Sequence, residues 1–347
     1  MTRLSIIIPV YNKGRLTRLM IESILANDFQ EWELLLVDDG SDEKEIQLIA
    51  EVVASDGRIH LTKRDRLPKG AQTCRNLGLE KAQGEYVCFF DNDDLITSCC
   101  LSTRVAEMDK HPELDFMVFP SATIIDNEWH PEAQDIVFGY PIYEDDKERF
   151  AARDLPFVVC NNIYRRQALT AHHLLWDTRL TSMQDADFNL NALMAGLSYA
   201  YANAQPDYGY RIGAAGTSTS KLITAKEQQQ SHLYAIENYL KQFYDSSEQY
   251  YYSVYEGILS LYNSFFTEGT DFAFAKKMAS VLKQYSPHYA YRLNLRIIAN
   301  RLFALCLPPK RARQMAMLLP LLKRRKQTRR KIELISQVIN QRIDEKQ

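Results

Sequence analysis

The chain has 347 residues, of which 46% are hydrophobic and 25% are charged. This composition is typical of a soluble globular protein and excludes a wholly disordered, collagenous or coiled-coil chain. The length predicts about two domains. The formal net charge of −2 hides a segregation, because residues 288–347 carry 15 basic and 3 acidic side chains, whereas residues 1–287 carry 27 and 41. The basic C-terminal stretch predicts a polyanionic partner, either a membrane or a nucleic acid.

Short apolar runs alternate with helical patterns over the first 125 residues. The apolar runs are rich in β-branched residues, which is typical of strands buried on both faces of a parallel sheet. The expected strands are 4–10, 33–37, 58–62, 85–90 and 115–125, and the expected helices are 15–26, 46–52, 71–82 and 98–110. Such alternation predicts an α/β fold, Rossmann-like, with a mainly parallel, doubly wound sheet.

The remainder of the chain is less regular at first and then helical. Residues 126–215 indicate short strands and a helix near 184–195, and helical patterns dominate from about residue 221. Prolines at 308, 309 and 320 would divide this part into separate helices. We therefore expect one domain over residues 1–220 and an α-helical C-terminal region over residues 221–347, which ends in a basic amphipathic tail.

Polar motifs follow three of the expected strands. They occupy residues 11–12, 38–39 and 91–94, and ligands of doubly wound sheets bind beyond the carboxyl ends of such strands. The three carboxylates of residues 91–94 would repel one another unless a hard cation such as Mg²⁺ or Mn²⁺ bound them. A solvated turn or a helix N-cap is the alternative, although the shared edge with residues 38–39 favours a ligand site.

Four segments, in this order, resemble the motifs of family 2 glycosyltransferases, which have the GT-A fold. They are residues 5–12 (SIIIPVYN), 37–41 (VDDGS), 75–86 (RNLGLEKAQGEY) and 90–94 (FDNDD). The resemblance extends from residue 4 to about residue 220, and the helical remainder carries no motif of the family. It implies an inverting, metal-dependent enzyme of the bacterial surface-polysaccharide type. Such an enzyme moves a sugar from a nucleoside-diphosphate sugar, here a UDP-sugar, to a hydroxyl of a glycan or lipid-linked acceptor.

The resemblance assigns roles to the residues that would bind the nucleotide sugar. Pro9 and Tyr11 would border the base, and Asp39 would accept a hydrogen bond from it. Arg75 would lie near the nucleotide, where a fixed cation offsets phosphate charge, and the alternative for it is a surface salt bridge. Arg211 would clamp the diphosphate when the loop of residues 210–220 closes, and the alternative for that loop is a flexible linker.

The same resemblance implies that the acidic turn holds a divalent cation, Mn²⁺ or Mg²⁺. Asp93 would bind the cation directly, and Asp91 would reach the ribose or a metal-bound water, so both are candidate metal ligands. For Asp94 we expect a plainer role as the N-cap of the following helix.

The catalytic base is expected at the start of the helix near residue 184. The family carries a Glu-Asp pair there, and this chain has Gln184 followed by Asp185. The resemblance implies that Asp185 takes the proton of the acceptor hydroxyl while the sugar transfers. The alternative is that Asp185 is a helix N-terminal carboxylate favoured by the macrodipole. Gln184 leaves open a second class of protein, which binds nucleotide sugars without catalysis.

The tail of residues 288–347 interleaves arginines and lysines with leucines, isoleucines and methionines. Basic amphipathic helices bind anionic membrane surfaces, and the scarcity of aromatic residues among the cations of residues 310–331 argues against a nucleic-acid binder. A solvated helix packed on the acidic body is the alternative. The N-terminus lacks the regions of a signal peptide, and no apolar stretch is long enough to span a membrane. We therefore expect a cytoplasmic protein, peripheral at the inner face of the cell membrane.

Overall fold

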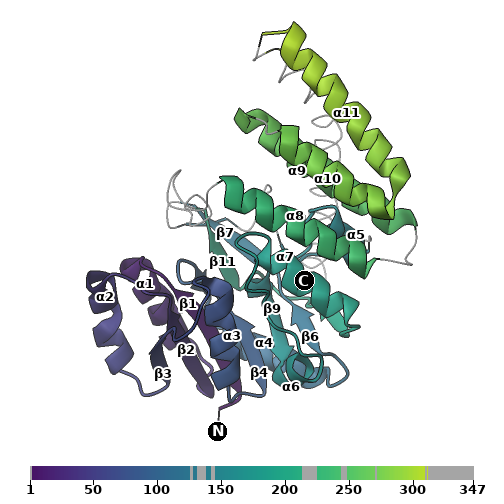
Figure 1. The fold of residues 1–347 in the computed structure, drawn as a ribbon. Coiled ribbons are helices and arrows are strands. Elements are labelled where there is room, and N and C mark those ends of the chain that lie inside the picture. The colour runs from purple at the N-terminus through teal and green to yellow at the C-terminus, as the bar shows by residue number, and fades with distance from the viewer. Residues whose placement is uncertain are drawn as a thin grey trace. The chain divides into compact units, whose positions relative to one another are not determined.

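The computed structural model describes residues 2–125, 128–130, 138–141, 145–212, 225–243, 248–269, 272–308 and 311. The chain forms two compact units. The first comprises Met1–Pro141 and Phe157–Leu222, and the second comprises Ile142–Pro156 and Ile223–Gln347. In Figure 1 the first unit runs from purple to teal, and the helices of the second are mainly green to yellow.

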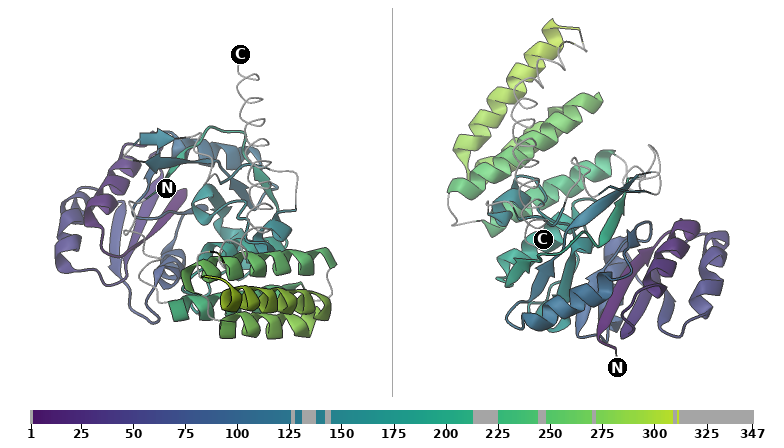
Figure 2. Two further views of the ribbon diagram at one scale, coloured as in Figure 1. Left: turned by 90° about the horizontal axis from the view of Figure 1, so that it is seen from above. Right: turned by 180° about the vertical axis from the view of Figure 1, so that it is seen from behind.

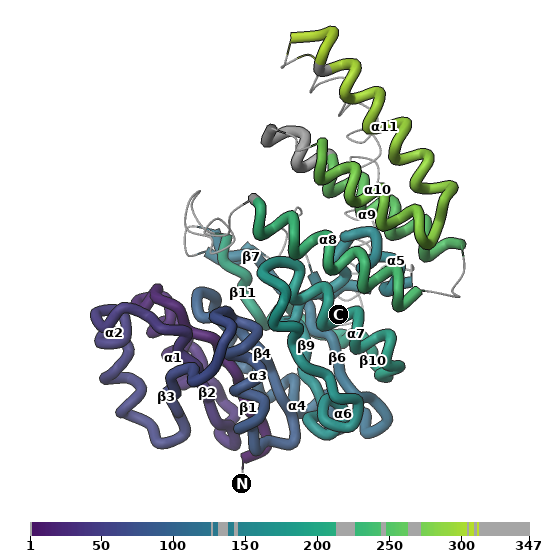
Figure 3. Tube along the Cα trace, in the orientation of Figure 1, coloured from purple at the N-terminus to yellow at the C-terminus, as the bar shows by residue number. Residues whose placement is uncertain are grey.

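The N-terminal part of the first unit alternates strands with helices. Its elements are β1 (Leu4–Val10), α1 (Gly14–Leu25), β2 (Trp32–Asp38), α2 (Glu43–Ala54), β3 (Ile59–Lys63), α3 (Ala71–Lys81), β4 (Tyr86–Phe89), β5 (Leu95–Ile96) and α4 (Cys100–Lys110). Every residue of β1 and β2 is buried, as expected for central strands with helices on both faces of the sheet. The tube in Figure 3 traces this part in purple and blue.

The rest of the first unit contains the shorter elements. They are β6 (Phe116–Val118), β7 (Ser121–Ile125), β8 (Glu128–His130), η1 (Val159–Asn161), β9 (Asn162–Arg165), α6 (Arg166–Ala171), α7 (Gln184–Met194), β10 (Tyr199–Tyr201) and β11 (Tyr208–Arg211). The prediction of a single strand over residues 115–125 is wrong, because β6 and β7 belong to different sheets. The break falls at Pro120, which has no N–H to donate to a ladder and a fixed φ.

The main sheet has seven strands in the order β10-β6-β9-β4-β1-β2-β3, in which β9 alone runs antiparallel to its neighbours. The purple and blue strands β1, β2 and β3 lie side by side within it (Figure 2). The predicted α/β class with a mainly parallel sheet is confirmed. A second sheet has the order β5-β11-β7-β8 and brings β11 beside β5, which directly follows the acidic turn of residues 91–94.

Helix α3 lies unusually close to the main sheet at Gly78. A Cβ on Gly78 would lie 2.4 Å from Cγ2 of Ile7 in β1, so no larger residue fits without a shift of the helix. The absence of a side chain at Gly78 lets α3 settle on β1 and β2. This close approach fixes the distance from the sheet of Arg75, which lies one turn earlier on the same helix.

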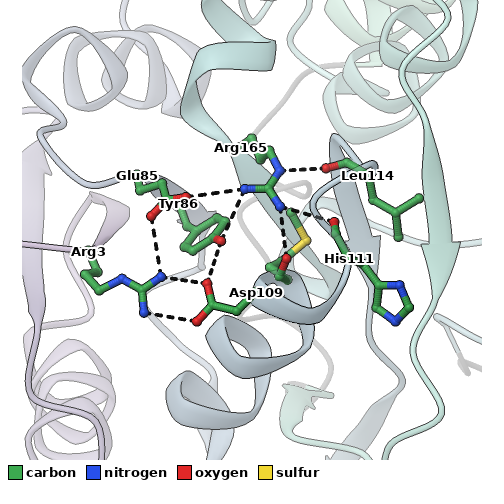
Figure 4. Close-up of polar contacts among 8 residues, drawn as sticks. Arg3, Glu85, Tyr86, Asp109, His111, Leu114 and Arg165 are labelled. Carbon is green, nitrogen blue, oxygen red and sulfur yellow. Dashed lines mark hydrogen bonds and ion pairs between the residues drawn. The ribbon is translucent and has the colours of Figure 1, made fainter.

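A cluster of ion pairs joins the opposite end of the sheet to α4 (Figure 4). The guanidinium of Arg3 donates to both carboxylate oxygens of Asp109, at 3.0 and 2.6 Å. The hydroxyl of Tyr86 donates to the same carboxylate at 2.8 Å, and Arg165 contacts the Tyr86 hydroxyl at 3.2 Å and Glu85 at 3.4 Å. The cluster therefore ties the amino ends of β1 and β4 to α4, leaving their carboxyl ends to the site.

The second unit is helical, as the sequence predicts. It contains α5 (Asp146–Ala151), α8 (Ala225–Gln242), α9 (Glu248–Gly269), α10 (Phe272–Tyr285) and α11 (Pro287–Cys306). Helix α5 groups with these helices because Gly257 of α9 has no side chain, and a Cβ there would lie 2.4 Å from the carbonyl oxygen of Ala151. Among the described residues, no helix has both the length and the apolarity needed to cross a membrane.

Candidate active site

The carboxyl ends of β4, β1 and β2 are neighbours in the main sheet, and they carry the three motifs. Pro9 is buried near the end of β1, opposite Val37 of β2. Tyr11 follows β1, Asp39 follows β2 and Asp91 follows β4 within two residues of each strand end. The parallel register therefore brings together groups that are far apart along the chain.

The turn after β1 is held in an unusual conformation. Asn12 and Lys13 have φ values of 55° and 56°, in the left-handed region that few residues other than glycine adopt. The backbone N–H of Asn12 donates to the Ser41 hydroxyl at 2.8 Å, and its side-chain oxygen accepts from the backbone of Asp42 at 2.9 Å. This turn directs Lys13 toward the acidic turn, where its Nζ lies 2.6 Å from Oδ2 of Asp93.

The expected base-binding residues lie beside the segment of residues 64–70. The ammonium of Lys69 lies 3.6 Å from the ring centroid of Tyr11. Asp39 is buried, and its Oδ1 accepts from Nε of Arg64 at 2.6 Å and from the backbone of Gly70 at 3.0 Å. Within the described part of the chain, Oδ2 of Asp39 has no hydrogen-bond partner, so it remains available to a ligand.

Arg75 is a buried cation rather than half of a surface salt bridge. It is 4% exposed, its Nη2 lies 2.6 Å from Oδ1 of Asp91, and its guanidinium lies 4.4 Å from the ring centroid of Trp176. Burial acts to lower the pKa of Arg75, but the charges of Asp91 and Asp185 outweigh it and raise that pKa. The guanidinium therefore interacts with two carboxylates from different parts of the sequence.

Asp185 is the second residue of helix α7, which follows Met183, and the φ of 64° at Met183 turns the chain into the helix. The side-chain amide of Gln184 donates to the carbonyl of Leu180 at 3.2 Å, a bond that a carboxylate would not make. Burial raises the pKa of Asp185 to about 6, while the charge of Arg75 lowers it and that of Asp91 raises it. A carboxyl group with such a pKa is well suited to accept a proton near neutral pH.

The three carboxylates of the acidic turn point to different partners. Asp91 contacts Arg75 and Asp93 contacts Lys13, whereas Asp94 is 3% exposed and faces β11. The expectation that Asp94 caps the next helix is wrong, because Cys99 precedes the first residue of α4.

Asp94 instead fastens β11 to the acidic turn. Its Oδ2 accepts from the Tyr208 hydroxyl and its Oδ1 from the backbone N–H of Arg211, both at 2.7 Å. Burial, with the charges of Asp93 and Asp91, raises the pKa of Asp94 well above its usual range. The buried carboxyl is thus a structural link, and its two oxygens are both engaged.

Arg211 also contacts the acidic turn, because its Nε donates to the carbonyl of Asp93 at 2.8 Å. The Tyr208 hydroxyl in turn accepts from the backbone N–H of Asp91 at 3.2 Å. The expected closing loop of residues 210–220 lies mostly outside the described residues, which end here at residue 212. Through these hydrogen bonds, β11 holds the turn that carries the candidate metal ligands.

The donor set of this site fits a divalent cation that arrives with phosphates. The described residues contain no group of three His, Cys, Asp or Glu side chains arranged for a metal. Asp91 and Asp93 remain partly open, with side chains 35% and 30% exposed. Mg²⁺ is commonly held by one or two carboxylates together with water and substrate phosphates, so two carboxylates are sufficient.

Three residues of the site escape sequence reasoning. Lys13, Lys69 and Tyr208 contact Asp93, Tyr11 and Asp91, although none of the three belongs to a motif identified from the sequence. For Lys13 the only signal is its place directly after the first motif. For Tyr208 no signal exists, because the second sheet that positions it is formed by strands distant in sequence.

Comparison with known proteins shows that the chain is similar to glycosyltransferases. Residues 5–173 match the family model described as glycosyl transferase family 2. A 100-residue stretch is 43% identical to an uncharacterized glycosyltransferase of Haemophilus influenzae, covering 28% of this chain and 39% of that protein. A 103-residue stretch is 34% identical to the GalNAc(5)-diNAcBac-PP-undecaprenol beta-1,3-glucosyltransferase of Campylobacter jejuni, covering 30% of this chain and 33% of that one. The chain thus spans well under two thirds of the length of either relative.

The fold as a whole is similar to that of S. aureus TarS 1–349 in complex with UDP-GlcNAc. The TM-score is 0.61 at 17% identity, over 97% of this chain and 90% of that one. Residues 5–173 therefore belong to a glycosyl transferase family 2 domain, and the α/β part of the chain has the GT-A fold. Asp185 lies beyond the residues that match the family model.

Proposed function

We propose that this protein is an inverting glycosyltransferase of cell-surface polysaccharide synthesis. It transfers a sugar from a nucleoside-diphosphate sugar, a UDP-sugar, to a hydroxyl of a glycan or lipid-linked acceptor. The observation that carries the proposal is Arg75, whose buried guanidinium interacts with both Asp91 of the acidic turn and Asp185 of α7. The UDP-GlcNAc complex of TarS and the undecaprenol-linked substrate named for the Campylobacter relative support the donor and acceptor classes.

Residues 1–220 form the proposed nucleotide-sugar-binding and catalytic domain. The free Oδ2 of Asp39 accepts a hydrogen bond from the base, because Arg64 and Gly70 hold the carboxylate through its other oxygen. Pro9 and Tyr11 border the base. Arg75 and Arg211 face the diphosphate, where their charges offset those of the phosphates.

Asp91 and Asp93 are the proposed ligands of Mn²⁺ or Mg²⁺. When bound, the cation offsets the charge of the diphosphate leaving group. Asp94 does not join them, because Tyr208 and Arg211 occupy its oxygens.

Asp185 is the proposed general base. Its pKa of about 6 leaves it mostly ionised at neutral pH, so it accepts the proton of the acceptor hydroxyl as that oxygen attacks the sugar. Attack from the face opposite the leaving group, with no enzyme nucleophile, inverts the anomeric centre. The proximity of Arg75 keeps the carboxylate ionised despite its burial.

The proposed second partner is an anionic membrane surface, bound through residues 288–347. Helix α11 contains arginines 292, 296 and 301 and no acidic residue. Its exposed apolar side chains recur every three or four residues, which places them on one face. They are Tyr291, Leu295, Ile298, Leu302 and Leu305. The basic run of residues 310–331 lies outside the described residues except for Arg311. The protein would then be cytoplasmic and peripheral at the inner face of the membrane, with no nucleic-acid partner.

A donor screen on the full chain tests the catalytic proposal. We expect UDP release from at least one UDP-sugar, only with Mn²⁺ or Mg²⁺ present. Asp185→Asn should lower turnover by about 10²- to 10⁴-fold with donor affinity retained, because only the proton acceptor is lost. Asp28→Asn, an exposed carboxylate at the end of α1, is the matched control. Full activity of Asp185→Asn, or turnover without a divalent ion, contradicts the mechanism. Donor binding without turnover in the wild type supports the alternative, a non-catalytic nucleotide-sugar-binding protein.

Vesicle sedimentation of the full chain tests the membrane proposal. Binding is expected to vesicles that contain anionic lipid, and Ile298→Glu should weaken it because a charge enters the apolar face of α11. Exposed Gln284→Glu, on α10, also adds one negative charge elsewhere in the unit and is the matched control. Equal binding to neutral vesicles argues against a contact that depends on anionic lipid. Retention on an oligonucleotide column without binding to vesicles argues for the nucleic-acid alternative.

A further inference from the structure

The Lys13 side chain pairs with a candidate metal ligand, although no motif assigns it a role. Its Nζ lies 2.6 Å from Oδ2 of Asp93, and the two side chains are 20% and 30% exposed. A lysine ammonium is a compact charge on a flexible stem, so it can leave one partner for another. The pair is therefore a contact that solvent and ligands can reach.

The backbone under Lys13 is built to present it in this position. Its carbonyl accepts from both the backbone N–H of Thr17, at 2.9 Å, and the Thr17 hydroxyl, at 3.1 Å. The Asn92 side chain of the acidic turn donates to the Thr17 hydroxyl at 2.8 Å and to the Asn12 carbonyl at 3.4 Å. A lysine with positive φ persists only where its surroundings impose it, and here these bonds do so.

The two carboxylates that face the proposed metal are neutralised in different ways. Asp91 pairs with Arg75, which is 4% exposed and packed against the Trp176 ring, so this pair is fixed. Asp93 pairs with Lys13, which is neither buried nor packed against a ring in the same way. Of the two pairs, only that of Asp93 can exchange its cation without disturbing the core.

We propose that Lys13 is the resident cation of the metal site, a proposal that rests on the function proposed above. Its ammonium holds the place on Asp93 that a divalent cation takes, and on displacement it pairs with the diphosphate of the donor. A divalent cation that binds alone meets two carboxylates already neutralised and must displace the lysine into water. A diphosphate gives the displaced ammonium a new partner, so metal and nucleotide favour each other's binding by the same factor.

Mn²⁺ binding to the full chain, followed by the electron paramagnetic resonance of the free ion, tests the proposal without any turnover. Lys13→Met keeps the length of the stem and removes the charge. We expect its Kd for Mn²⁺ alone to fall about two- to fivefold, as for loss of a partly exposed competing ion pair. Its affinity for UDP in metal-free buffer should fall, and the factor by which UDP strengthens Mn²⁺ binding should shrink.

Three further variants make the result specific. Lys13→Arg keeps the cation and should bind Mn²⁺ as the wild type does, while Lys13→Gln serves as a second uncharged variant. Lys81→Met removes an exposed lysine from the last turn of α3 and should change neither affinity. This inference alone is overturned if the wild type binds both Mn²⁺ and UDP but Lys13→Met and Lys13→Gln bind Mn²⁺ no tighter than the wild type does. A wild type that binds neither ligand overturns the proposed function together with it.

Discussion

Asp187 lies two residues after the proposed base and is a buried carboxyl group with one unsatisfied oxygen. It is 2% exposed, its Oδ2 accepts from the Asn191 side chain at 2.9 Å, and its Oδ1 has no hydrogen-bond partner among the described residues. Burial, followed by the charge of Asp177, raises the pKa of Asp187 to about 7. We expect Asp187→Asn to stabilise the protein at alkaline pH, because the amide has no charge to desolvate and can still accept from Asn191.

The size of this effect depends on pH. The pKa of Asp187 rises from 3.8 to about 7 on folding, a shift worth about 4 kcal/mol when the group is fully ionised. Because the folded-state pKa is raised, the stability contributed by the protonated form is present below pH 3.8 and is lost as the pH rises through about 7. Between about pH 5 and about pH 8, the wild type should lose about 2.5 kcal/mol of unfolding free energy relative to Asp187→Asn.

Urea unfolding followed by tryptophan fluorescence measures this difference. All three tryptophans, at positions 32, 129 and 176, belong to the first unit, so the signal reports the unit that contains Asp187. Asp28→Asn removes an exposed carboxylate, and its difference from the wild type should stay constant between the two pH values. An equally constant difference for Asp187→Asn refutes the reasoning, because it means that the buried carboxyl carries no ionisation cost.

Three further predictions concern the same unit. Asp207→Asn removes the partner of the fully buried Arg104, which Asp207 holds by two bonds of 2.7 Å, and should lower the free energy of urea unfolding by about 3–5 kcal/mol. Turnover should fall as the pH drops through about 6, because Asp185 acts as a base only when ionised. Tyr208→Phe removes one of the two groups that donate hydrogen bonds to Asp94. The Kd for the nucleotide sugar in the presence of Mn²⁺ should then rise about tenfold.

Each of these predictions has a result that contradicts it. Adding Arg104→Met to Asp207→Asn should recover much of the lost stability, since no buried charge then lacks a partner, and no recovery would count against the ion-pair argument. An acidic limb below about pH 4 would mean that Asp185 is not the titrating base or is not desolvated. Wild-type donor affinity in Tyr208→Phe would show that the link to β11 does not support the acidic turn.

Local pattern accounts for most of the first 110 residues. The apolar run of residues 4–10 coincides with β1, and the helix expected over 71–82 is α3, because each element is defined by its own hydrophobic periodicity. The acidic turn can be recognised from the sequence because it directly follows the apolar run that predicts a buried strand. The family resemblance rested on these strand ends, and the family model matches the same part of the chain.

Non-local pairing accounts for the errors. Residues 115–125 form one mainly apolar stretch, and although Pro120 marks the break, no local pattern reveals that β6 pairs with β9 and β10 while β7 pairs with β8 and β11. Asp94 resembles a helix cap in sequence, but its carboxylate accepts hydrogen bonds from Tyr208 and Arg211 of the second sheet. Helix α5 groups with the helices of the second unit, where it packs on α9, and no pattern within that helix indicates this.

Local pattern is sufficient to predict the α/β class, the helical C-terminal region and the residue types of the candidate site. Those features follow from hydrophobic pattern and from motifs, both of which are local along the chain. Which carboxylates stay open, and which cations oppose them, depends on contacts between distant segments. Asp94 is enclosed by β11, Asp91 is held by the buried Arg75, and Asp93 meets the movable Lys13. Burial and charge depend on neighbours in space, and those neighbours are assigned when the sheet forms.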